Sequence, residues 1–179
     1  MSIIESNNTL LLQLISDILD LSKIESNTME FCFGEHSLHT LLSDIYQSQL
    51  LTMPPQVELR LELPQADTTI RTDASRLKQV VNNLINNAAK FTDKGNITFG
   101  YRTADGAGEV ELFVRDTGKG ISQEHLSRIF ERFYRVDKAR SKKTGGTGLG
   151  LAIVKHIAEQ HEAEIQIDST LGELSLIHI

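Results

Sequence analysis

Four short segments of this chain alternate apolar and polar side chains, with the two-residue period of a β-strand that has one buried and one wet face. These segments are residues 57–63, 97–101, 110–114 and 163–167. Helical patterns interleave with them at residues 38–51, 74–91 and 149–160. Because such strands need a cover on their apolar face, and the helices can supply it, the sequence predicts an α+β fold: a two-layer sandwich with helices on one face of a sheet.

The composition narrows the classes of function. The chain has 179 residues, which suits one domain with an accessory element, and 40% of them are hydrophobic, which excludes wholesale disorder. With 18 Lys and Arg against 24 Asp and Glu, the formal net charge is -6, so we expect no nucleic-acid partner. A single cysteine, Cys32, and the lack of a long apolar run predict a cytoplasmic protein.

Residues 4–25 carry apolar side chains at heptad-like spacing. The repeat positions are Ile4, Leu11, Leu14, Ile18 and Leu21. Further apolar side chains widen this face, at Leu10, Ile15 and Leu19. The pattern predicts a long helix that pairs with other helices, and a helix packed on its own domain is the alternative.

Four asparagines stand inside the helical segment 74–91, which Asp73 is placed to cap. Asn costs roughly 0.5 kcal/mol relative to Ala inside a helix, so folding alone would not select four of them. Asn83, Asn87 and Lys90 are spaced i, i+4, i+7 and share one line beside an apolar stripe. Amide oxygens are hard ligands for Mg²⁺, and an ammonium group suits phosphate. The segment indicates a magnesium and phosphate site, with an exposed polar stripe as the alternative.

Six of the 12 glycines fall in two short loops. In residues 116–121, Asp116 follows a strand and can accept a hydrogen bond from an exocyclic amine; a turn capped by aspartate is the alternative. In residues 144–151, the glycines lead into a helix whose free N–H groups form an anion cradle. This second loop is neither a P-loop nor a dinucleotide fingerprint.

Between the two loops, residues 128–143 hold seven basic side chains against two acidic ones, a local charge of +5 in a chain of net charge -6. The segment has few apolar anchors. We expect a mobile lid over a phosphate site, and a solvated basic loop is the alternative.

In this order, and over nearly the whole chain, these segments resemble the ATP-binding domain of bacterial sensor histidine kinases. That domain belongs to a superfamily shared with DNA gyrase, a heat-shock chaperone family and the MutL repair proteins. The N box, first glycine box, F box and second glycine box resemble residues 83–91, 116–121, 129–135 and 146–151. Residues 7–25 resemble the second helix of the dimerisation hairpin. The resemblance implies a Bergerat-type fold, a mixed sheet with helices on one face, preceded by a long dimerisation helix.

The resemblance also implies a site for ATP and Mg²⁺. Asp116 would bind the adenine amino group, Asn87 would ligate Mg²⁺ with Asn83 assisting, and Lys90 and Arg135 would hold phosphate oxygens. Asn87, Lys90 and Arg135 would therefore be the catalytic residues. The other residues expected at the nucleotide are Gly118, Gly120, Ile121, Phe130, Tyr134, Gly146, Thr147, Gly148, Leu149 and Gly150.

One position distinguishes transfer from hydrolysis within the superfamily. Hydrolytic relatives place a glutamate, the general base for water, four residues before the magnesium-ligating asparagine. Here that position is Asn83, which cannot take a proton. The resemblance therefore predicts an ATP-dependent protein-histidine kinase of a two-component system, whose phosphoryl group passes to a response-regulator receiver domain. A nucleotide-binding module without transfer and an ATP hydrolase are the alternatives.

The two ends of the chain depart from the family pattern. The phosphoacceptor histidine belongs in a first dimerisation helix, where none of the 6 histidines lies. We therefore expect a fragment that is not competent for autophosphorylation alone. Its parent would dimerise through residues 1–26, and missing upstream segments would anchor that parent in the inner membrane if it is a membrane protein. Residues 27–173 would be the catalytic domain. Residues 174–179 match the translated end of a sequencing-library transposon, so we expect them to be adapter-derived.

Overall fold

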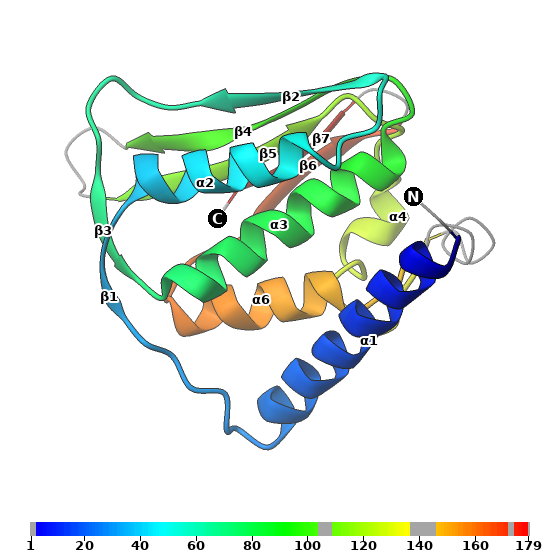
Figure 1. Ribbon diagram of the computed structural model, residues 1–179, viewed down its shortest axis with the longest axis horizontal. Helices are drawn as coiled ribbons and strands as arrows, with labels where there is room; N and C mark the ends of the chain where they lie inside the picture. Colours follow the sequence, from blue (N-terminus) through cyan, green and yellow to red (C-terminus); the bar gives the residue numbers. More distant parts are fainter. Residues whose placement is uncertain (1–2, 104–108, 137–145, 172–173, 179) are drawn as a thin grey trace.

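The computed structural model describes residues 3–103, 109–136, 146–171 and 174–178, and its ribbon has a helical layer against a sheet (Figure 1). The helices are α1 (Ile3–Glu25), α2 (Leu38–Leu50), α3 (Ala74–Phe91), α4 (Gln123–Leu126) and α6 (Gly150–Gln160). The strands are β1 (Gly34–Ser37), β2 (Val57–Glu62), β3 (Thr69–Thr72), β4 (Gly95–Thr103), β5 (Val110–Asp116), β6 (Gln166–Thr170) and β7 (Leu174–His178).

Five strands form a mixed sheet in the order β2-β4-β5-β7-β6. β2 and β4 run parallel, and every other neighbouring pair is antiparallel. α2, α3 and α6 lie on the same side of this sheet (Figure 1), where their apolar side chains join those of β2, β4 and β5 in one core. The predicted two-layer α+β sandwich is therefore confirmed.

α3 is the central helix of the covering layer, and its sequence explains its bounds. Asp73 caps it, because the carboxylate accepts hydrogen bonds from the backbone N–H groups of Ser75 and Arg76 at 2.9 and 3.0 Å. The predicted apolar stripe is buried and gains Val80; its predicted members are Leu77, Val81, Leu84, Ile85 and Ala88. The four asparagines lie outside this buried stripe: Asn82, Asn83 and Asn87 are half-buried, and Asn86 is exposed.

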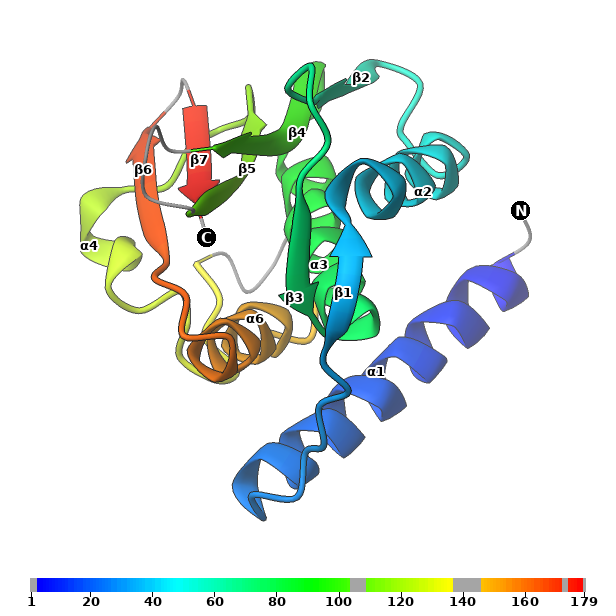
Figure 2. The same cartoon turned by 90° about the vertical axis from the view of Figure 1, so that its left-hand side faces the viewer.

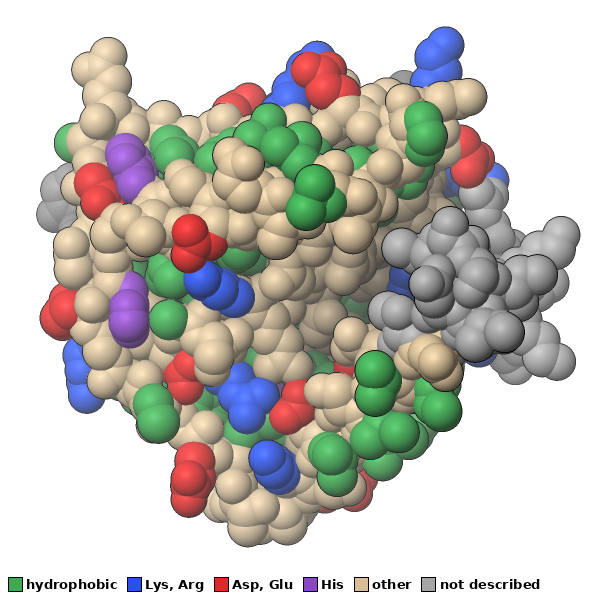
Figure 3. Space-filling model, viewed as in Figure 1, with side chains coloured by type: hydrophobic (Ala, Val, Ile, Leu, Met, Phe, Trp, Pro, Cys, Tyr) green, Lys and Arg blue, Asp and Glu red, His purple; other side chains and the backbone are tan. Residues whose placement is uncertain are grey.

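α1 runs along the edge of the helical layer beside α6 and away from the sheet (Figures 1 and 2). One of its faces packs on the domain, where Asp17 and Asp20 are buried. Its other face keeps large apolar side chains in solvent, and Figure 3 shows such side chains gathered over this helix. These exposed side chains are Leu11, Leu12, Ile15, Ile18 and Leu19. Packing on its own domain, the alternative reading of the sequence, thus accounts for one face and leaves the other uncovered.

The predicted strand at residues 163–167 begins too early. Glu162 has a left-handed backbone with φ 54, and the N–H of Ala163 donates to the carbonyl of Ala158 at 2.9 Å. These contacts end α6, so the N–H of Ala163 is not free for a strand, and β6 begins at Gln166. Two short strands, β1 and β3, were not predicted; they pair with each other outside the main sheet.

Residues 174–178 form β7, which lies between β5 and β6. Strand pairing uses backbone groups that every residue except proline carries, so the position of β7 does not test whether this segment is adapter-derived. No helix of the described part of the chain is long and apolar enough to cross a membrane.

Candidate functional site

The C-terminal end of β5 holds a buried carboxylate at one end of the site. Asp116 is 8% exposed, and its Oδ1 accepts a hydrogen bond from the N–H of Gly118 at 2.8 Å and a longer one from the Thr92 hydroxyl at 3.5 Å. Among the described residues, none donates a hydrogen bond to its Oδ2. Burial raises the pKa of Asp116, although these two hydrogen bonds oppose the rise. The site therefore contains a carboxylate with one oxygen fixed and the other available to an N–H donor.

The turn after Asp116 has room only for glycine. A Cβ at Gly118 would lie 2.7 Å from the backbone oxygen of Phe91. Gly120 has a φ of +65, and a Cβ there would lie 2.0 Å from the backbone oxygen of Thr170. The N–H of Ile121 donates to the hydroxyl of Ser169 at 2.7 Å. The predicted glycine turn is therefore braced from both sides, by the end of α3 and by β6.

The four asparagines of α3 separate into different environments. Asn82 accepts a hydrogen bond from the Gln49 amide at 2.8 Å and so ties α3 to α2. Asn86 is exposed. Asn83 and Asn87 are half-buried on the edge that faces α6, where the Asn83 amide donates to the carbonyl of Gly150 at 3.4 Å. The bond from Nδ2 leaves the Asn83 Oδ1 free, as a metal ligand requires.

A pair of cations forms the other end of the site. Burial lowers the pKa of Lys90, the carboxylate of Asp17 opposes this effect, and the charge of Arg135 adds to it. The Nε and Nη2 atoms of Arg135 are buried and have no hydrogen-bond partner among the described residues. Buried donors without a partner cost free energy, so these two atoms mark a place where an anion would bind.

The second glycine loop carries a threonine towards the same end. Thr147 Oγ1 donates to Asp17 Oδ2 at 2.9 Å and accepts from the N–H of Leu149 at 3.1 Å. Gly148 has φ +75, and a Cβ there would lie 2.9 Å from the backbone of Phe133. Gly146 is half-buried, and Gly150 begins α6 beside Asn83.

The expected lid segment divides between two surroundings. The hydroxyl of Tyr134 forms a hydrogen bond with Nδ1 of His125 at 2.7 Å. The guanidinium of Arg128 lies 4.2 Å from the centre of the Tyr134 ring. Phe130 lines a groove of about 450 Å³ between α1 and α6, together with Leu21 and Ile24. These neighbours of the two rings lie outside the set of residues expected at the nucleotide. Residues 137–145, the rest of the predicted lid, lie outside the described residues.

No group of three or more histidine, cysteine, aspartate or glutamate side chains suited to a metal ion occurs in the described ranges. The amide oxygens of Asn83 and Asn87 remain as candidate protein ligands. Two amides make a weak cation site, and Mg²⁺ usually completes its coordination with water and substrate phosphate. The residues present therefore fit Mg²⁺ that arrives with a phosphorylated ligand.

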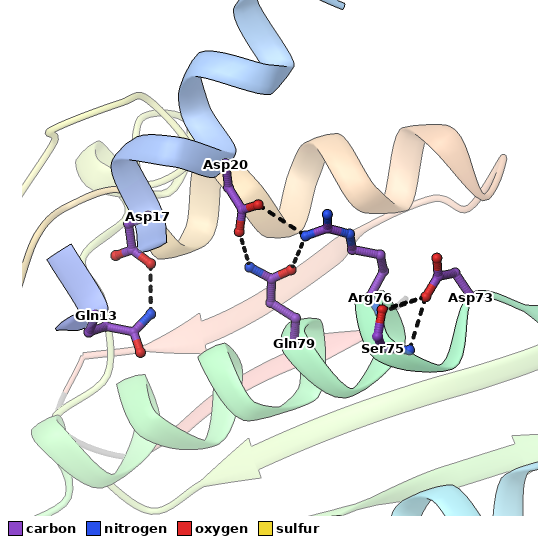
Figure 4. Close-up of polar contacts among 7 residues, drawn as sticks. All are labelled: Gln13, Asp17, Asp20, Asp73, Ser75, Arg76 and Gln79. Atoms are coloured by element: carbon purple, nitrogen blue, oxygen red, sulfur yellow. Dashed lines mark hydrogen bonds and ion pairs between the residues drawn. The ribbon is translucent and has the colours of Figure 1, made fainter. Parts of the chain in front are cut away.

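Sequence reasoning missed two residues of the site. Thr92, which is 2% exposed, bonds to Asp116, and Asp17 reaches Thr147 from the N-terminal helix. Figure 4 shows how α1 is held nearby: Asp20 lies between Arg76 and Gln79 of α3, at 3.1 and 2.7 Å. Two aspartates among the leucines and isoleucines of this helix were the signal that could have indicated a buried polar contact.

Comparison with known proteins gives consistent matches. Residues 72–179 match the family model described as histidine kinase-, DNA gyrase B-, and HSP90-like ATPase. The sensor histidine kinase WalK of Bacillus subtilis is 35% identical over 164 residues, which are 91% of this chain and 27% of that protein. The sensor histidine kinase RppB of Synechocystis is 37% identical over 177 residues, 98% of this chain and 39% of that protein. The chain thus spans less than half the length of these relatives.

Solved structures give the same result. The crystal structure of full-length ShkA in complex with AMPPNP superimposes with a TM-score of 0.82 and 28% identity, over 94% of this chain and 35% of that one. A nucleotide-free catalytic domain of the histidine kinase ThkA superimposes with a TM-score of 0.66 and 26% identity, over 84% of this chain and 95% of that one.

Proposed function

Because this chain belongs to the family of histidine kinase-, DNA gyrase B-, and HSP90-like ATPases, we propose that it is the Mg-ATP-binding catalytic domain of a two-component sensor histidine kinase. In this proposal it transfers the γ-phosphoryl group of ATP to a histidine of a dimerisation helix, and a response-regulator receiver domain then takes the group. Relatives with the printed name sensor histidine kinase support this choice within the superfamily.

The observation that carries the proposal is the opposite chemistry of the two ends of the site. The free Oδ2 of Asp116 suits the exocyclic amine of adenine, and the unpaired donors of Arg135 beside Lys90 suit phosphate oxygens. The last turn of α3 connects these ends, since the carbonyl of Phe91 accepts from the N–H of Lys119 in the glycine turn at 3.3 Å. A ligand with an N–H donor at one end and anionic oxygens at the other describes an adenine nucleotide.

Asn83 and Asn87 would hold Mg²⁺, with the nucleotide supplying phosphate ligands. When bound, Mg²⁺ neutralises charge that develops on the phosphate oxygens. The chain's own part is to position the nucleotide: Asp116 fixes the base, Lys90 and Arg135 hold phosphate oxygens, and the second glycine loop excludes water. Phosphoryl transfer needs such positioning more than covalent chemistry from the protein.

Hydrolysis is the second candidate, and the environment of residue 83 disfavours it. An amide that donates to the Gly150 carbonyl and cannot take a proton is no general base for water. The remaining alternative is a module that binds nucleotide without transfer.

The exposed apolar face of α1 supports the proposed homodimer. Five large side chains in solvent along one helix are far more than an isolated domain usually leaves uncovered, and a second copy of the helix would bury them.

Labelled γ-phosphate tests the proposal. The chain is mixed with Mg-ATP and a separately made dimerisation hairpin that carries the acceptor histidine, and label on the hairpin is measured before and after acid treatment. We expect acid-labile label on the hairpin. Asn87→Ala should abolish it, while Asn86→Ala, an exposed asparagine of the same helix, should leave it unchanged.

The other outcomes are distinct. Label released as free phosphate would favour the hydrolase. ATP binding without any label transfer, in a chain that melts cooperatively, would favour the nucleotide-binding module.

A further inference from the structure

The N-terminal helix places a carboxylate at the phosphate end of the site. Asp17 is 3% exposed, and it receives hydrogen bonds from Gln13 at 2.7 Å and from Thr147, 130 positions later in the chain, at 2.9 Å. Its charge also acts on Lys90. Asp17 therefore acts on Lys90, which the proposed function assigns to the phosphates, and bonds to Thr147 of the second glycine loop.

The contact is held in place by a docked helix. Three positions along α1, Asp20 bonds to Arg76 and Gln79 of α3 (Figure 4). At the C-terminal end of the helix, Glu25 forms an ion pair with Arg132. Acidic side chains thus fix α1 to the domain at three points, and one of these points is the phosphate end itself.

A single carboxylate does not satisfy this end of the site. Asp17 offsets the charge of Lys90, yet two buried donors of Arg135 remain without a partner among the described residues. A triphosphate carries more charge and more acceptor oxygens than a carboxylate and would satisfy these donors as well. Two anionic groups at neighbouring positions repel each other, so triphosphate binding and the docked position of Asp17 would each weaken the other.

We propose that Asp17 competes with the terminal phosphates of the nucleotide for Thr147 and Lys90, so that the docked position of α1 and triphosphate binding oppose each other. This inference rests on the proposed function, because it needs the phosphates at Lys90 and Arg135. The docked helix then acts as an autoinhibitory contact: the site keeps its adenine end open while α1 covers its phosphate end, and a bound triphosphate releases the helix.

Calorimetric titration of the 179-residue chain with ATP and with adenosine tests the competition. Asp17→Asn removes the charge but keeps the size of the side chain and its ability to bond to Thr147. We expect about three- to tenfold tighter ATP binding, because one of the two charges that repel each other is removed, and unchanged adenosine binding. Glu30→Gln is the matched control, since it removes an equal charge from an exposed position outside the site and should change neither affinity.

Hydrogen exchange on the unmodified chain gives a second measurement that does not depend on any variant. ATP should speed the exchange of the α1 backbone around residue 17, because it displaces the helix, while adenosine should not.

Each outcome is decisive. Unchanged or weaker ATP binding by Asp17→Asn, with normal adenosine binding, would overturn the competition and leave the proposed function intact. Slower exchange of α1 with ATP would overturn it too, because the nucleotide would then hold the helix. Failure of the unmodified chain to bind ATP or adenosine would contradict the proposed function, and this inference with it.

Discussion

The two ends of the site differ in how much of their structure is in place before a ligand binds. At the Asp116 end, the carboxylate, Gly118 and Thr92 are joined by hydrogen bonds, and the glycine turn has backbone on both sides. At the Arg135 end, two buried donors lack partners within the described part of the chain, and a carboxylate from a distant helix bonds to Thr147. The contrast teaches that the base end is built by the fold, while the phosphate end is completed by whichever anion binds there.

The largest effect should come from adding a side chain to the glycine turn at the Asp116 end of the site. Gly120→Ala would place a Cβ 2.0 Å from the backbone oxygen of Thr170, at a φ of +65 that disfavours alanine. We expect a loss of about 3 kcal/mol in the free energy of unfolding, measured by urea denaturation. Gly150→Ala is the control, because its nearest atom would be at 3.6 Å, an ordinary contact. Equal stability of the two variants would show that the turn can yield.

Replacing Asp116, which is proposed to bind adenine, should weaken the binding of both ATP and adenosine. Asp116→Ala deletes the only proposed partner of the adenine amine, so ATP and adenosine should both bind about 100-fold more weakly, as expected for a buried hydrogen bond to a charged group. Titration calorimetry with both ligands measures this. A loss confined to ATP would place Asp116 at the wrong end of the site.

Replacing Arg135 at the phosphate end should weaken the binding of ATP without changing the binding of adenosine. Arg135→Gln leaves the adenine end untouched, so ATP should bind about tenfold more weakly and adenosine with unchanged affinity. Because the lost interaction is electrostatic, the difference between the variant and the unmodified chain should shrink at high salt. An equal loss for both ligands would contradict the division into two ends.

The smallest effect concerns stability and pH. Burial raises the pKa of Asp116 above its ordinary value of 3.8, against the hydrogen bonds from Gly118 and Thr92. The folded chain therefore holds this proton more tightly than the unfolded chain, and its stability falls as the pH rises from 3.8 through the folded pKa.

Asp116→Asn removes this loss of stability at higher pH, because asparagine does not ionise. At neutral pH we expect the variant to unfold with about 1 kcal/mol more free energy than the unmodified chain, and at about pH 3 the gap should close because Asp116 is then protonated. Chemical denaturation at the two pH values measures the gap. A variant that is less stable at neutral pH would mean that the ionised carboxylate supports the turn.

The sequence predicted those parts that depend on local chemistry. The cap at Asp73 and the apolar stripe of α3 specify a helix without reference to the rest of the chain, and the alternating segments specify three strands of the main sheet nearly in place. β1 and β3 were missed because each has only four residues, and their pairing joins segments separated by a whole helix and a strand. Strands that short carry too little pattern to be recognised.

The residues of the site also divide into those that a local motif indicates and those that depend on contacts between distant segments. Asp116 and the glycines could be assigned from a motif, because a strand, a turn and their spacing are all local. The position of Asp17 could not, because it depends on which face of α1 docks and where, and the heptad pattern favours the opposite face. The roles of Asp116, Asn83, Asn87, Lys90 and Arg135 in binding a nucleotide remain predictions until the titrations are made.

The order of strands has a consequence for the chain while it is being synthesised. Among the described strands, β6 has β7 as its only neighbour, although β7 follows it in sequence. β6 in turn braces the glycine turn, through Ser169 to Ile121 and through the backbone of Thr170. We therefore expect a nascent chain on the ribosome to be unable to hold adenine until a strand occupies the place of β7, whichever sequence supplies that strand, so that binding is acquired in one late step rather than gradually.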